Sequence, residues 1–469
     1  MLSMAALGAT VSFVGLGGAA SAGTTSSPVV VSPLVTAPGS PDSTTTVPAG
    51  GASTTTVPSK PGNNAIDHAG AGLDGTGSSF AAPAIETFQQ QVQAAPYNLN
   101  VNYSSTSSGD GRFEFTNGTT DFAVSDIAYG LGSVDTTPPS FPYIYVPITA
   151  GGIAFMYDIP GLSKTLQLNS YDTCAILTGG IQNWNDPHIA QQNPGVNLPN
   201  LPIRPVTESD PAGTNYVLEE YCIQEQPAIW AAFANFENSQ SGNGVVIDAH
   251  SPQSEWPALQ NGLNADSTAA VASAVSTNPG AIGGVQLQYA VDAGFDKGDT
   301  SRSVAAELNA SGDYVQPTSV DVASALAYAT QLPNGTHKLD FGGVGPYVYN
   351  PSTYSYLLTP TKGWSSAKGA VMSGFVNYAL TIGQQKSPSI GYASLGLSLE
   401  RYGIDAVTAD VPGAVKTTAA EAAAYACGDL TPAEVAVGQT TPTCGVLNAN
   451  DQAPIPAGGG AGAIGGAGA

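Results

Sequence analysis

Three glycine-containing turns, each between a strand-like and a helix-like segment, are the residues of this sequence best suited to bind an anion. They lie at residues 75–83, 107–111 and 210–216. Small residues where a strand meets the N-terminus of a helix leave backbone N–H groups free, and those groups attract negative charge together with the helix dipole. Three turns of one chemistry predict a site for a small oxyanion rather than a catalytic centre.

The elements that would position these turns are indicated by the neighbouring residues. Residues 99–103 have the pattern of a strand that leads into the second turn, and a further strand ends on Asp126. Strand and helix signals alternate from Gly72 onward, which is typical of an α/β fold. Residues 143–157 form a long apolar segment with a glycine pair, and this segment predicts a buried strand.

Charge and composition exclude several classes of partner. The chain has 12 basic and 35 acidic residues and a formal charge of −23, which argues against nucleic acid and anionic membrane surfaces. It does not argue against a small anion, because local hydrogen-bond donors set the affinity inside a closed cleft. The four histidines are scattered and no C-x-x-C motif occurs, so neither a metal nor a cofactor is expected.

The N-terminal residues predict export from the cytoplasm. Residues 4–18 are apolar and an A-x-A pattern follows at 20–22, so a signal peptide is expected over residues 1–22. No cysteine lies near this site, and an N-terminal lipid anchor is therefore not expected. Residues 23–69 are rich in Thr, Ser, Pro and Gly and predict a disordered linker, either a spacer across a cell wall or low-complexity filler.

Later segments carry a resemblance to a known family. Beyond the glycine turns, residues 180–189 show a G-I-x-x-W-N-D-P-x-I pattern, and the segments 279–285, 354–358 and 383–395 follow in order. Over residues 70–405 the sequence resembles the phosphate-binding proteins of phosphate ABC transporters, the PstS family of the periplasmic-binding-protein superfamily.

The resemblance implies a two-lobed α/β fold of the type II class, in which two crossover strands form a hinge and the ligand is clamped between the lobes. Lobe one is expected at residues 70–150 and 338–405 and lobe two at 151–337. An Ala/Gly-rich tail is expected over residues 406–469.

The even number of cysteines in an exported chain predicts two disulfides. Cys427 and Cys444 both lie in the tail and are expected to pair there. Cys174 and Cys222 would then pair within one lobe.

The resemblance also implies individual contacts to phosphate. They fall on Ser79, Phe80, Ser108, Asp126, Gly213 and Thr214, with the amides of Gly109 and Gly111 as further candidates. Asp126 matches the buried acid that accepts a proton from the ligand. A desolvated carboxylate repels an oxyanion unless the oxyanion brings an O–H donor, as hydrogen phosphate does and sulfate does not.

The third turn departs from the family pattern. Where the family has an arginine shortly before a Ser-Gly-Thr sequence, this chain has Glu208 and Ala212. A carboxylate in place of a guanidinium predicts weaker binding of an anion. Arg112 and Arg204 are candidates to replace the missing cation, although Arg112 could instead pair with acidic neighbours on a solvated face of its own helix.

Two functions are consistent with these residues. The resemblance implies an exported solute-binding protein that binds inorganic phosphate or a related oxyanion and delivers it to the membrane permease of an ABC transporter. The alternative is a surface or adhesion protein that keeps the fold with a degenerate ligand site, which the carboxylate at Glu208 and the Thr/Pro stalk favour. An enzyme is not expected, because residues 77–79 do not form a G-x-S-x-G elbow and no histidine accompanies a nucleophile.

Overall fold

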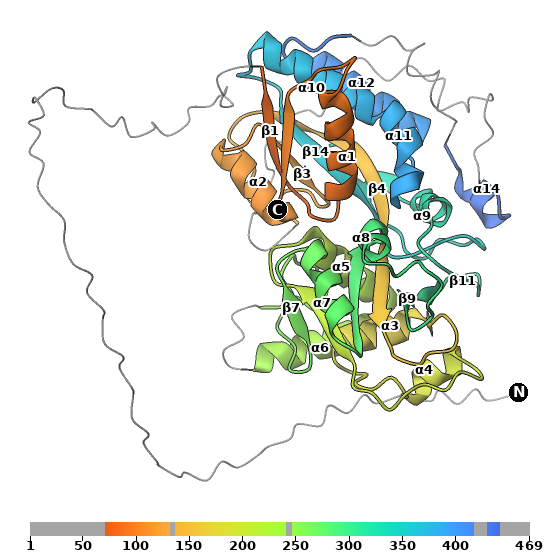
Figure 1. Cartoon of the computed structure of the whole chain (residues 1–469). Coiled ribbons are helices and arrows are strands. Elements are labelled where there is room, and N and C mark those ends of the chain that lie inside the picture. The colour runs from red at the N-terminus through yellow and green to blue at the C-terminus, as the bar shows by residue number, and fades with distance from the viewer. Residues whose placement is uncertain (1–70, 132–136, 241–245, 417–428, 441–469) are drawn as a thin grey trace, which may run out of the picture. The chain divides into compact units, whose positions relative to one another are not determined.

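The computed structural model describes residues 71–131, 137–240, 246–416 and 429–440 (Figure 1). The predicted signal peptide over 1–22, the predicted linker over 23–69 and the predicted Cys427–Cys444 bridge lie outside the described residues. Strands and helices alternate through the described chain, as the sequence predicts from Gly72 onward.

A nine-stranded mixed sheet forms the centre of the described chain. Its strands are β1 (Leu73–Gly77), β2 (Val101–Ser105), β3 (Phe122–Ser125), β4 (Tyr143–Asp158), β6 (Arg204–Glu208), β7 (Leu263–Ala265), β8 (Ala281–Gln286), β9 (Arg302–Val304) and β14 (Ser352–Pro360). The strand order is β2-β1-β3-β14-β4-β8-β6-β7, and β9 also pairs with β4. Smaller sheets are formed by β5 (Gln167–Leu168), β10 (Ala306–Leu308) and β11 (Tyr314–Val315), and by β12 (Thr330–Gln331) and β13 (His337–Lys338).

The long strand β4 joins the two groups of parallel strands. Its first part pairs antiparallel with β14, and its second part pairs antiparallel with β8 and β9. Figure 1 shows β4 running from the group that contains β1 and β3 to the group that contains β7. All of its residues after Tyr143 are buried. A strand buried on both faces needs apolar residues on both, and this explains the nearly continuous apolar sequence of the segment. The strand predicted at residues 143–157 is confirmed.

Helices flank both groups of strands. They are α1 (Ala82–Gln93), α2 (Ser108–Asn117), α3 (Ser170–Leu177), α4 (Pro187–Gln192), α5 (Gly213–Glu225), α6 (Pro227–Ser239), α7 (Thr268–Thr277), α8 (Leu287–Asp292), α9 (Ser319–Leu326), α10 (Ser366–Ala379), α11 (Ile382–Lys386), the 3-10 helix Ser387–Ile390, α12 (Leu397–Asp410) and α14 (Pro432–Ala436). Helices α1, α2 and α10 pack against β1–β3, whereas α7 packs against β6, β7 and β8. No helix in the described ranges is both long and apolar enough to cross a membrane.

Parallel pairing places the three predicted turns at two edges of the sheet. Strand β1 pairs in parallel with β2 and β3, and β6 pairs in parallel with β7 and β8. Because the carboxyl ends of parallel strands meet at the same edge, the turns after β1, β2 and β3 share one edge, and those after β6 and β7 share another. Such edges are where ligands bind in open α/β sheets.

Part of the predicted tail packs on the domain. Helix α12 continues to Asp410, past the boundary expected at residue 405. Helix α14 buries Val435 against Ala325 and Val348, so apolar side chains in this Ala/Gly-rich region still contribute to a small core.

The disulfide between Cys174 and Cys222 is confirmed, and it joins α3 to α5. The bridge spans 48 residues, so loop closure restricts the unfolded chain. The double variant Cys174→Ala/Cys222→Ala is expected to lower the free energy of unfolding by about 4 kcal/mol in a chain-entropy estimate. Urea unfolding of both proteins measures this difference, and equal midpoints would contradict it.

Candidate functional site

The predicted turns converge where the two sheet edges meet. The first turn follows β1, the second precedes α2, and the third lies between β6 and α5. Hydrogen bonds cross between the edges, and Ser79 contacts both Glu208 and Thr268 although Thr268 is 189 residues away in the sequence. The structure thus brings together residues that the sequence places in separate turns.

Tyrosine side chains hold the carbonyl groups of the first turn. The hydroxyl of Tyr103 donates to the Ser78 carbonyl at 2.9 Å, that of Tyr289 to the Ser79 carbonyl at 2.7 Å, and that of Tyr392 to the Phe80 carbonyl at 2.5 Å. These bonds fix the orientation of the peptide groups. The amide of Phe80 has no acceptor among the described residues, so it remains a donor available to a ligand.

Asp126 is the buried acid at the centre of the site. It follows β3 and is 5% exposed. Its carboxylate accepts hydrogen bonds from the hydroxyls of Ser78 (2.7 and 2.9 Å), Ser108 (3.1 Å) and Ser355 (2.5 Å). Burial raises the pKa of Asp126, and these donors oppose the rise. The site therefore holds a desolvated carboxyl group among hydroxyl donors.

Arg112 supports Asp126 from within the protein. The side chain is fully buried, and Nη1 donates to the Ser125 hydroxyl at 2.5 Å and to the Ile127 carbonyl at 3.1 Å. Its charge lowers the pKa of Asp126. Pairing on a solvated helix face, one of the two outcomes left open by the sequence, is wrong because the helix turns this residue into the core.

Glu208 is enclosed between the two edges. The side chain is 2% exposed and lies 3.4 Å from the Ser79 hydroxyl and 3.2 Å from the Thr268 hydroxyl, both of which donate to it. Thr214 also hydrogen-bonds to this carboxyl group. Burial, with a further contribution from the Asp210 carboxylate, raises the pKa of Glu208 to about 8. The raised pKa favours the protonated, neutral form of this carboxyl group, and that form repels an anion less than a carboxylate does.

Gly213 brings the third turn into contact with Asp126. A Cβ atom at this position would lie 2.5 Å from Asp126 Oδ2 and 2.6 Å from Ser108 Oγ, so a side chain larger than hydrogen does not fit. The amide of Gly109 donates to the Pro211 carbonyl at 2.9 Å. The second and third turns thus touch directly.

Two of the candidate amide donors are engaged within the protein. Gly109 donates to the third turn, and Gly111 donates to the Ser107 carbonyl at 2.9 Å in the first turn of α2. Helix formation occupies the Gly111 amide, so its predicted contact with a ligand is wrong for this structure. The Gly109 amide is occupied only by the contact between the turns, and its contact with a ligand stays a prediction. Arg204 is exposed at the opposite end of β6, about 13 Å from Glu208 at the usual rise per residue, and does not replace the missing cation.

Three further residues belong to the site. Ser78 lies in the first turn, and its hydroxyl contacts both oxygens of the Asp126 carboxylate. Its position next to Ser79, a predicted site residue, is the sequence signal that could have indicated it. Ser355 lies within the recognisable segment 354–358, but only the pairing of β14 beside β3 brings it to Asp126. Thr268 begins α7, and nothing in its local sequence indicates this position.

The site combines hydrogen-bond donors with two buried carboxyl groups, Asp126 and Glu208. Hydroxyl groups and the amide of Phe80 can donate hydrogen bonds, Glu208 can do so in its protonated form, and Asp126 accepts them. Within the residues that the structure describes, no group of three or more His, Cys, Asp or Glu side chains is arranged to hold a metal ion.

Comparison with known proteins finds a matching family model and similar phosphate-binding proteins. A family model described as a PBP superfamily domain matches residues 38–381. The phosphate-binding protein PstS of Xylella fastidiosa is 27% identical over 329 residues, which cover 69% of this chain and 81% of that protein. PstS 2 of Mycobacterium tuberculosis is 33% identical over 177 residues, which cover 37% of this chain and 47% of that protein.

A solved structure shows the same fold. A phosphate-binding protein from Stenotrophomonas maltophilia has a TM-score of 0.53 at 20% identity, covering 73% of this chain and 96% of that one. The predicted α/β fold of the periplasmic-binding-protein class is confirmed.

Proposed function

The chain belongs to the PBP superfamily, and from this premise we propose that it is an extracytoplasmic solute receptor that binds hydrogen phosphate or a related protonated oxyanion between its three turns. In this role it performs no catalysis and delivers the ligand to the membrane permease of an ABC transporter. The names of its relatives support phosphate as the ligand. The A-x-A pattern at residues 20–22 supports a location outside the cytoplasm.

The environment of Asp126 is the observation that carries this proposal. A buried carboxylate facing a bound oxyanion is stabilised only when the oxyanion donates a proton to it. Ser108 contacts this carboxylate, Ser79 and Thr214 contact the neighbouring Glu208, and these hydroxyls together with the Phe80 amide are the proposed donors for the remaining ligand oxygens. The same arrangement disfavours sulfate, which has no O–H group at neutral pH.

Binding requires an exchange of hydrogen-bond partners. In the structure, Ser79 donates to Glu208 and Ser108 donates to Asp126. A hinge movement that separates the third turn from the first two would release the Ser79 hydroxyl to the ligand, whereas Ser108 and Asp126 share one edge of the sheet and would stay together. Because part of the intrinsic affinity is used to break contacts with Glu208, we propose that phosphate binds more weakly than in relatives with an arginine at this turn.

Calorimetric titration of the exported domain with phosphate, arsenate and sulfate tests this function. Phosphate and arsenate are expected to bind, with sulfate about tenfold weaker or more because it leaves Asp126 unpaired. The receptor from Stenotrophomonas maltophilia, titrated in parallel, provides the reference affinity. Failure of all three oxyanions to bind would overturn the proposal and favour a surface protein with a degenerate site.

A further inference from the structure

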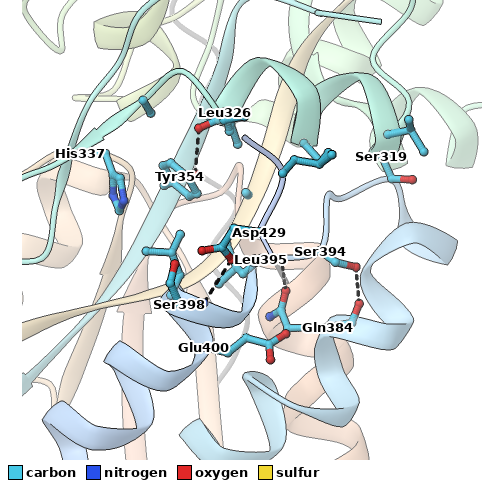
Figure 2. Close-up of a pocket in the computed structure, with 18 of the residues that line it drawn as sticks. Ser319, Leu326, His337, Tyr354, Gln384, Ser394, Leu395, Ser398, Glu400 and Asp429 are labelled. Carbon is cyan, nitrogen blue, oxygen red and sulfur yellow. Dashed lines mark hydrogen bonds between the residues drawn. The ribbon is translucent and has the colours of Figure 1, made fainter. Parts of the chain in front are cut away.

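A cavity of about 490 Å³ lies apart from the three turns. It is bordered by α9, β14 and the segment from α11 to α12, with residues 429–430 on one side (Figure 2). None of the described residues that line it belongs to the three turns. Its volume is within the range of about 300–1,000 Å³ that is usual for small-molecule sites, so it could hold a ligand of its own.

Apolar side chains reach this cavity from two of the elements around it. Val320, Ala323 and Leu326 come from α9. Leu399 lies in the first turn of α12, and Leu395 precedes that helix. These side chains favour a ligand with an apolar body, because the cavity removes that body from water.

Two rings add apolar surface without adding charge. The rings of His337 and Tyr354 lie 4.2 Å apart, and both residues line the cavity. Burial lowers the pKa of His337 to about 4, so this ring is uncharged at neutral pH. The Tyr354 hydroxyl donates to the Leu326 carbonyl at 3.3 Å and is therefore already engaged.

The polar groups of the α11 side are also engaged within the protein. The Gln384 side chain donates to the Ile148 carbonyl at 3.1 Å and to the Ala379 carbonyl at 2.8 Å. It accepts a hydrogen bond from the Leu395 amide at 2.9 Å. The Ser394 hydroxyl donates to the Gln384 carbonyl at 2.7 Å. These groups fix the shape of the cavity rather than offer hydrogen bonds to a ligand.

The two acidic residues of the lining do not make the cavity a site for a charged ligand. Asp429 accepts a hydrogen bond from the Ser398 amide at 3.1 Å, in the first turn of α12, where the helix dipole stabilises a carboxylate. Burial and the Asp429 carboxylate raise the pKa of Glu400 to about 9, against the opposing charge of Arg401. Glu400 is therefore uncharged at neutral pH. The described lining contains no lysine or arginine.

Glu400 supplies the hydrogen-bonding point of this otherwise satisfied lining. It is 3% exposed, and its Oε2 atom is buried without a hydrogen-bond partner in the described chain. No other described residue that lines the cavity has a buried side-chain oxygen or nitrogen in this state. A protonated carboxyl group can donate a hydrogen bond, and a carbonyl oxygen on a ligand would accept it without bringing charge into the cavity.

We propose that this cavity binds a small uncharged molecule that has an apolar body and a carbonyl group. The carbonyl oxygen would accept a hydrogen bond from Glu400, and the apolar body would lie along Ala323, Leu326 and Leu399. The site is separate from the three turns, and the proposal does not depend on phosphate binding.

Prodan, an uncharged naphthalene ketone, is a suitable probe because its fluorescence moves to shorter wavelength in apolar surroundings. Titration of the full chain at neutral pH is expected to show saturable binding with this shift. Acetylnaphthalene should displace prodan. Naphthoate has a similar size but carries a charge, and should displace it at least about tenfold less effectively. Equal displacement by the two compounds would contradict an uncharged site.

Two variants of Glu400 test the hydrogen bond. In each protein, the affinity for acetylnaphthalene is divided by that for ethylnaphthalene, which lacks the carbonyl, so that changes in packing largely cancel. Glu400→Met removes the donor and should lower this ratio by about fivefold. Glu400→Gln keeps an uncharged donor and should leave the ratio within about twofold of the wild-type value. An unchanged ratio in the Glu400→Met protein would overturn the proposal.

A third variant tests the location of the site. Ala323→Phe narrows the cavity from α9, and it should lower the affinity for prodan by at least about tenfold while the circular dichroism spectrum stays as in the wild type. Unchanged prodan binding in this protein would place the probe elsewhere and overturn the proposal. So would the absence of saturable prodan binding to the wild type.

Discussion

Replacing Asp126 by asparagine is expected to lower the affinity for hydrogen phosphate by about 10- to 100-fold and to raise the affinity for sulfate. Asp126 is buried, and Ser78, Ser108 and Ser355 surround its carboxylate. A carboxylate can only accept a hydrogen bond here, which selects a ligand that carries a proton. The amide of asparagine also donates, so it tolerates a fully ionised oxyanion.

The measurement is paired titration of the wild type and the Asp126→Asn protein with phosphate and sulfate. Asp110→Asn is the matched control, since Asp110 is an exposed carboxylate at the start of α2. The Asp110→Asn change removes one negative charge near the site, as Asp126→Asn does, but at a residue that does not contact the ligand. It should therefore change the affinities for phosphate and sulfate only slightly and by the same factor. If Asp126→Asn keeps the wild-type preference for phosphate over sulfate, Asp126 does not receive the ligand proton.

The affinity for phosphate is expected to fall as the pH rises above about 8, by up to about tenfold per pH unit, and the Glu208→Gln variant should lose most of this dependence. Burial raises the pKa of Glu208 to about 8. Below that pH the protonated carboxyl group is neutral and can donate a hydrogen bond. Above it the carboxylate repels the ligand and holds the Ser79 and Thr268 hydroxyls.

Comparing the two proteins at each pH cancels the titration of phosphate itself. Burial raises the pKa of Asp210 to about 7. Because Asp210 is still present in the Glu208→Gln protein, a smaller dependence of the phosphate affinity on pH should remain there. Glu220→Gln is the control. Burial also raises the pKa of Glu220, to about 7, but Glu220 lies on α5 and does not contact Ser79, so this variant should keep the wild-type dependence on pH. A parallel decline in the wild-type and Glu208→Gln proteins would show that another group causes it.

The same ionisation affects stability. The pKa of Glu208 is higher in the folded chain than its ordinary value of 4.5, so the folded state binds more protons between those two pH values. The contribution of this group is therefore fully present below about 4.5 and is lost as the pH rises to about 8. The Glu208→Gln protein should lose less stability over this range, which urea unfolding at several pH values measures.

Much of the architecture could be predicted because it depends on short stretches of sequence. The turn at residues 107–111 combines a capping serine with glycines, and Ser107 does accept a hydrogen bond from the Asp110 amide at the start of α2. The unbroken apolar run at 143–157 gives a strand buried on both faces. Cys174 and Cys222 pair as the even number of cysteines suggests.

The contacts inside the site depended on tertiary structure. Ser355 reaches Asp126 across 229 residues, and Arg112 is buried beneath it instead of facing solvent. Local sequence determines where a strand ends and a helix begins, because those preferences arise within a few residues. Which side chains then share a hydrogen bond, and whether the carboxyl group of Glu208 is charged, depends on the desolvation and partners that only packing of distant strands creates.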